Sequence, residues 1–126
     1  MKEKFQLEYV LNNVSTNILW NSISTPNGLA EWFADKVSVE DNIYTFQWGK
    51  SSQSSAELIH NRTGSYMQFH WLGDEPKTYF EFRISLAELT NDVILTITDF
   101  ALPEEKEESI DLWNSEVTKL RKAYGM

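Results

Sequence analysis

The side chains that most often carry acid–base or metal chemistry are scarce in this sequence, which has two histidines, His60 and His70, and no cysteine. A histidine that binds a metal or acts as a general base needs a second histidine or a carboxylate at suitable spacing, and neither histidine has one. The sequence also lacks a Ser-His-Asp set, a Gly-rich phosphate loop, an HExxH motif and paired-carboxylate spacing. We therefore predict no catalytic residue, no metal ligand and no cofactor.

Asp99 ends an apolar row formed by Val93, Leu95 and Ile97, so the alternation points its carboxyl inward. At the rim of a cavity, this carboxyl would orient a polar group of a ligand or act as a base with a raised pKa. At the end of a strand, it would instead accept hydrogen bonds from backbone N–H groups. The sequence leaves both interpretations open.

Aromatic side chains are numerous, with five Trp, five Tyr and seven Phe. The alternation of polar and apolar residues points several of them toward the space between the predicted sheet and the C-terminal helix, namely Trp48, Trp71, Phe80, Phe82 and Trp113. These rings either fill the core or line an internal cavity, and the sequence alone supports both. His70 is predicted on the outer face of the sheet, where Glu81 and Arg83 are expected as solvated residues that could pair across strands.

The elements that must position these side chains follow from periodicity. Residues 4–11 alternate as a strand, after which Ser15 and Thr25 are predicted N-caps of two short helices. A period of two then predicts a meander of about six strands, with residues 49–55 expected as a loop and turn signals every 8–12 residues. Apolar residues spaced as on one face of a helix predict a long C-terminal helix over about residues 105–124.

Length and composition limit the class of protein. The 126 residues fit one domain, residues 1–126, and a composition with 41% hydrophobic residues is that of a folded protein. A net charge of −8 argues against general binding to nucleic acid or an anionic membrane. No apolar run approaches the ~20 residues of a membrane span, and the N-terminus lacks the apolar stretch of a signal peptide. We expect a cytoplasmic protein.

The order of elements resembles the helix-grip fold of the START-like superfamily, also called SRPBCC. Local motifs are similar to the branch of activators of the heat-shock-protein ATPase. In that branch the helical pair carries a Trp followed by T-P-x-x-L-x-x-W-F, matched here by Trp20, Thr25, Pro26, Leu29, Trp32 and Phe33. Further matches are the strand ending Phe69-His70-Trp71, the run Leu95, Ile97, Asp99 and Phe100, and Trp113 and Leu120 of the last helix.

The resemblance implies an α+β fold in which a curved antiparallel sheet of about seven strands wraps around the C-terminal helix. It favours binding of a hydrophobic or amphipathic small molecule, such as a lipid, in a cavity between sheet and helix. An interaction protein that activates a chaperone ATPase is the alternative, and a cyclase or dehydratase is a third, less favoured because no histidine points inward. The expected ligand-binding residues are Trp32, Phe46, Trp48, Phe69, Trp71, Phe80, Phe82, Ile97, Asp99, Trp113 and Val117.

Overall fold

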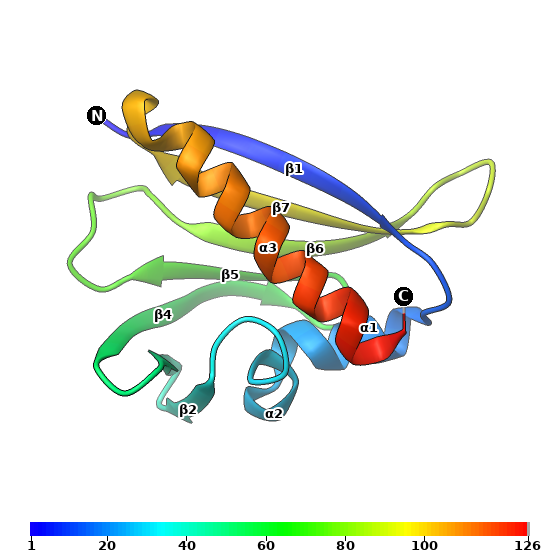
Figure 1. The fold of residues 1–126 in the computed structure, drawn as a ribbon, viewed down its shortest axis with the longest axis horizontal. Helices are drawn as coiled ribbons and strands as arrows, with labels where there is room; N and C mark the ends of the chain where they lie inside the picture. The colour runs from blue at the N-terminus through cyan, green and yellow to red at the C-terminus, as the bar shows by residue number, and fades with distance from the viewer. Residues whose placement is uncertain (126) are drawn as a thin grey trace.

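A computed structural model describes residues 1–125 as one sheet with three α-helices (Figure 1). The elements in chain order are β1 (Glu3–Leu11), α1 (Thr16–Ser24), α2 (Pro26–Leu29), β2 (Lys36–Glu40), β3 (Ile43–Trp48), β4 (Ser52–Arg62), β5 (Tyr66–Trp71), β6 (Phe80–Leu86), β7 (Val93–Ala101), a 3-10 turn (Pro103–Glu105) and α3 (Lys106–Tyr124).

The seven strands form one antiparallel sheet in the order β1-β7-β6-β5-β4-β3-β2. Each strand from β2 to β6 pairs with the next strand in the chain, while β1 joins the sheet beside the last strand, β7. Figure 1 shows α3 crossing one face of this sheet on a diagonal, with its C-terminal end beside α1. The predicted α+β helix-grip fold, with its single sheet and two short helices after the first strand, is confirmed.

The two short helices begin at the predicted caps. The side-chain oxygen of Ser15 accepts a hydrogen bond from the backbone N–H of Ile18 at 3.1 Å, and that of Thr25 accepts one from Gly28 at 2.9 Å. Each bond satisfies an N–H that has no partner inside its helix. Pro26 occupies the first turn of α2, where its missing N–H costs nothing.

Helix α3 spans 19 residues, and its ends match the charge pattern of the sequence. Glu107 and Glu108 lie in the first turn, and Arg121 and Lys122 in the last, so both ends complement the helix dipole. Gly125 follows with a positive φ of 69°, a conformation that glycine adopts without strain and that ends the helix.

Two predictions made from the sequence are wrong in detail. Strand β4 already begins at Ser52, within the segment 49–55 expected as a loop, because its polar residues pair with β3, Ser52 opposite Trp48. Glu81 is 6% exposed rather than solvated. It pairs with Arg83 on its own strand, Oε2 to Nε at 3.0 Å, and its Oε1 accepts a bond from Gln68 on the neighbouring strand β5 at 3.0 Å.

The core lies between the sheet and the helices and is rich in aromatic rings. Phe69 and Phe80, opposite each other on β5 and β6, stack with ring centroids 4.9 Å apart. Trp32, after α2, packs on Phe82 at 5.3 Å and donates from its indole N–H to the carbonyl of Ser22 on α1 at 2.8 Å. These contacts fix the short helices against the sheet, beside one end of α3.

Candidate ligand-binding pocket

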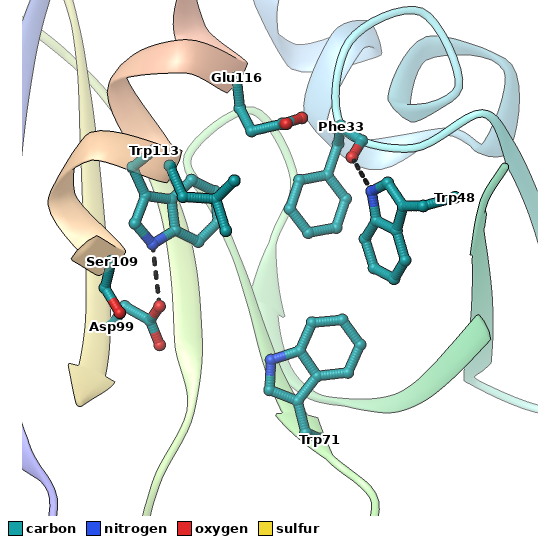
Figure 2. A pocket seen from close by; sticks show the side chains of 8 residues that line it. Phe33, Trp48, Trp71, Asp99, Ser109, Trp113 and Glu116 are labelled. Atoms are coloured by element: carbon teal, nitrogen blue, oxygen red, sulfur yellow. Dashed lines mark hydrogen bonds between the residues drawn. The ribbon is translucent and has the colours of Figure 1, made fainter. Parts of the chain in front are cut away.

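A pocket of about 330 Å³ lies between α3 and the sheet and is open to solvent. Helix α3 contributes half of its lining from one face, since the four residues are spaced 3, 1 and 3 positions apart. The other four residues come from the segment after α2, from the ends of β3 and β5, and from β7 (Figure 2). The lining residues are Phe33, Trp48, Trp71, Asp99, Ser109, Leu112, Trp113 and Glu116.

Four of the eight lining residues are aromatic, and their rings form a continuous wall. Phe33 stacks on Trp113 with centroids 5.6 Å apart and ring planes at 14°, and it meets Trp48 edge-on at 5.8 Å. Trp48 lies 6.2 Å from Trp71, which stacks at 4.8 Å on the buried Phe80. The indole N–H of Trp48 also donates to the carbonyl oxygen of Phe33 at 2.7 Å. Because the rings are held by one another and by this bond, the wall is preformed.

Asp99 lies on β7, and its hydrogen bond to Trp113 connects α3 to the sheet (Figure 2). Its Oδ2 accepts a hydrogen bond from Trp113 Nε1 at 2.8 Å, and its Oδ1 accepts one from the backbone N–H of Phe100 at 2.7 Å. Burial raises the pKa of Asp99 above its ordinary value, and the two hydrogen bonds oppose the shift. Asp99 therefore combines the two alternatives left by the sequence, because it borders a pocket and also accepts a backbone N–H.

Glu116 is a second carboxyl in the pocket, and the sequence analysis did not identify it. Figure 2 shows its carboxyl extending from α3 toward Phe33. Oε1 accepts a hydrogen bond from Lys119 Nζ at 3.3 Å, whereas Oε2 is buried and has no hydrogen-bond partner within residues 1–125. Burial raises the pKa of Glu116, and the charge of Lys119 opposes that rise. A buried acceptor without a partner is costly, so this oxygen is suited to a donor from a ligand.

The structure brings four of the eleven expected binding residues together around the pocket: Trp48, Trp71, Asp99 and Trp113. The other seven are packed in the core, each 2% exposed or less, and a role for them in binding stays a prediction; they are Trp32, Phe46, Phe69, Phe80, Phe82, Ile97 and Val117. The sequence analysis missed four lining residues: Phe33, Ser109, Leu112 and Glu116. Ser109, Leu112 and Glu116 lie on the same face of α3 as Trp113, and this spacing is the sequence signal that could have identified them.

Neither histidine lines the pocket. His60 is exposed, and His70 Nδ1 lies 2.7 Å from the carbonyl oxygen of Thr78 in the loop between β5 and β6. Among residues 1–125, no group of three or more His, Asp or Glu side chains is arranged to hold a metal ion. The helices of the same residues include none that is both long and apolar enough to cross a membrane.

The sequence profile of the START-like superfamily domain matches residues 1–126, the whole chain. The chain belongs to the START-like superfamily. This match confirms the predicted superfamily and agrees with the sheet and long C-terminal helix of the structure.

Solved structures place this START-like domain among proteins of the same fold. BfR322 from Bacteroides fragilis, a solution NMR structure, is 51% identical, with 96% of this chain and 90% of BfR322 covered and a TM-score of 0.67. The Aha1 dimer from Colwellia psychrerythraea is 13% identical, with 97% and 96% covered and a TM-score of 0.79. DynU16, a protein in the dynemicin biosynthetic locus, is 16% identical, with 94% of this chain and 46% of DynU16 covered and a TM-score of 0.79. The last two similarities show the fold alone. No curated protein matches the chain.

Proposed function

We propose that this START-like domain binds a small hydrophobic or amphipathic molecule in the pocket between α3 and the sheet. The observation that carries the proposal is the preformed aromatic wall of Phe33, Trp48, Trp71 and Trp113 around an open pocket. Ligand pockets are usually concave, largely apolar and about 300–1,000 Å³ in volume. The pocket volume of about 330 Å³ falls at the small end of that range, which favours a compact ligand over a long lipid.

The pocket presents ring faces more than polar edges. The indole N–H groups of Trp48 and Trp113 are both engaged, with Phe33 and Asp99 respectively, so these rings offer apolar faces to a ligand. Aromatic faces pack well on flat apolar molecules, in offset-stacked or edge-on geometry. An aromatic ligand with one polar group suits this lining, since the polar group can lie near the two carboxyls.

Ser109→Trp is expected to abolish binding, because Ser109 lines the pocket and an indole at this position would fill it. A library of small aromatic compounds, screened by saturation-transfer NMR, should give several ligands for the wild-type protein and none for this variant. Ser115→Trp is the matched control, because Ser115 is exposed on the same helix and lies outside the pocket lining. The control should retain every ligand of the wild type.

Two outcomes would contradict the proposal. The first is a library without a single ligand for the wild-type protein. The second is a Ser109→Trp variant that is folded, as judged by its amide NMR spectrum, and retains the wild-type ligands, because binding would then occur elsewhere.

We do not extend chaperone-ATPase activation or cyclase and dehydratase activity to this chain. The similarity to Aha1, at 13% identity, concerns the fold alone, and fold does not determine function. No specific feature of the pocket favours either activity over simple binding.

A further inference from the structure

The ionisable side chains that line the pocket are all acidic. Asp99 and Glu116 are its two ionisable side chains, and no Lys, Arg or His is among the lining residues. Lys119 bonds to Glu116 Oε1 from outside the lining, with 59% of its side chain exposed. The charge of Lys2 lowers the pKa of Asp99, but Lys2 is itself paired with Asp74, Nζ to Oδ1 at 2.8 Å. The environment around the aromatic wall is therefore acidic.

Within this acidic lining, Glu116 provides a defined hydrogen-bond acceptor for a ligand. Its side chain is 10% exposed, and its Oε2 is buried without a hydrogen-bond partner among the described residues, while Lys119 holds Oε1 at 3.3 Å. Asp35 adds further negative charge near this carboxyl. An N–H donor of a ligand would satisfy Oε2, and a charged donor would do so most strongly, because charge-assisted hydrogen bonds are roughly twice as strong as neutral ones.

The rings around Glu116 favour the same kind of ligand. Its carboxyl extends toward Phe33 in Figure 2, and Trp48, Trp71 and Trp113 complete the aromatic wall of the same pocket. An organic cation is attracted to the negative face of an aromatic ring, most strongly to that of tryptophan. Ring faces and a carboxylate thus both attract a cation, whereas the charges of the two acids repel an anionic group.

We propose that the pocket selects a compact aromatic or aliphatic molecule carrying an ammonium or amidinium group over neutral and anionic molecules of the same shape. This inference rests on the proposed binding function and adds the class of ligand. The lining also contains Trp71 Nε1 and the Ser109 hydroxyl, which can donate to a neutral acceptor. Neither group bonds to Glu116 Oε2 in the structure, so this oxygen can accept a hydrogen bond from a cationic N–H donor.

Three probes of similar shape test this selectivity: the cation 2-(1-naphthyl)ethylamine, the neutral 2-(1-naphthyl)ethanol and the anion 1-naphthaleneacetate. Isothermal titration calorimetry at neutral pH and low salt should show that the amine binds about tenfold or more tightly than the alcohol, with the acetate weakest. Glu116→Gln keeps the shape of the side chain but removes its charge, so the amine should lose most of its advantage. Asp111→Asn, an exposed site on the same helix, is the control for net charge and should retain the advantage.

The pH dependence provides an independent readout that does not need a variant. Burial raises the pKa values of both Asp99 and Glu116. The charge of Lys2 lowers and that of Asp74 raises the pKa of Asp99, and Lys119 lowers and Asp35 raises the pKa of Glu116. A bound cation favours the charged carboxylates, so acidification through these pKa values should weaken binding of the amine and leave that of the alcohol unchanged.

The outcomes separate this inference from the function on which it rests. If the alcohol binds as tightly as the amine, or if Glu116→Gln preserves the advantage of the amine, the cation selectivity is wrong while the binding function stands. If all three probes and the wider aromatic library fail to bind, both proposals fall. If Glu116→Gln does not fold, the wild-type comparison of amine with alcohol and its pH dependence decide.

Discussion

Replacement of Phe80 with alanine is expected to lower the free energy of unfolding by about 3–5 kcal/mol. Phe80 is fully buried at the start of β6 and stacks on Phe69 at 4.9 Å and on Trp71 at 4.8 Å. The substitution removes these contacts and leaves a cavity, and the rigid neighbouring strands can collapse into it only in part. A loss of this size is a large fraction of the ~5–15 kcal/mol that typically stabilises a folded protein.

Urea denaturation of the wild type, Phe80→Ala and Leu86→Ala measures this effect. Leu86 lies on the same strand but is 53% exposed, so its replacement removes much less buried surface and should cost under about 1 kcal/mol. Equal midpoints for Phe80→Ala and wild type would show that the aromatic core is packed differently from the structure.

Gly28→Ala is expected to destabilise the protein by about 1–3 kcal/mol or more. In most helices this change stabilises by up to ~1 kcal/mol, because alanine has the higher helix propensity. Here a Cβ on Gly28 would lie 2.8 Å from the Cα of Ser22 and from the carbonyl carbon of Asn21, and closer still to the Asn21 oxygen. These are backbone atoms, so α2 would have to move away from α1.

The position of α2 matters for the pocket as well as for stability. The backbone N–H of Phe33 donates to the carbonyl oxygen of Leu29 at 2.9 Å, so a displaced α2 would displace the Phe33 wall. Thermal and urea denaturation of Gly28→Ala should be compared with Asn27→Ala, an exposed neighbour in the same helix that is expected to be near neutral. A Gly28→Ala variant as stable as wild type would mean that the two helices do not pack this closely.

Much of the fold could be predicted because its signals are local. The alternation within each strand, the N-caps Ser15 and Thr25, and the apolar stripe of α3 each depend on residues close in sequence. The limits of local signals appear at β4, where Ser52 joins a strand through its pairing with Trp48 rather than through its own propensity. Glu81 is likewise buried, and its Oε1 accepts a hydrogen bond from Gln68 of the neighbouring strand β5, which is 13 residues away in the sequence.

The pocket was harder to predict, because alternation gives the side of the sheet on which a residue lies but not its depth. Phe80 and Trp71 point to the same side of the sheet, yet Phe80 is covered by other rings and Trp71 reaches the pocket. Polar Glu116 and Ser109 fell outside the apolar stripe used to define the buried face of α3, although they lie beside it. Only the three-dimensional arrangement shows that an open pocket remains between this part of α3 and the sheet.

The indole N–H signals in a ¹H–¹⁵N NMR spectrum test the central claim, that the ligand binds between α3 and the sheet, most directly. Trp48, Trp71 and Trp113 line the pocket, whereas Trp20 lies on α1 outside the lining. Saturation with 2-(1-naphthyl)ethylamine, or with the tightest ligand of the aromatic library, should shift the three pocket signals and leave that of Trp20 in place. A saturated complex in which the pocket signals stay unmoved, or in which only Trp20 shifts, would contradict the account.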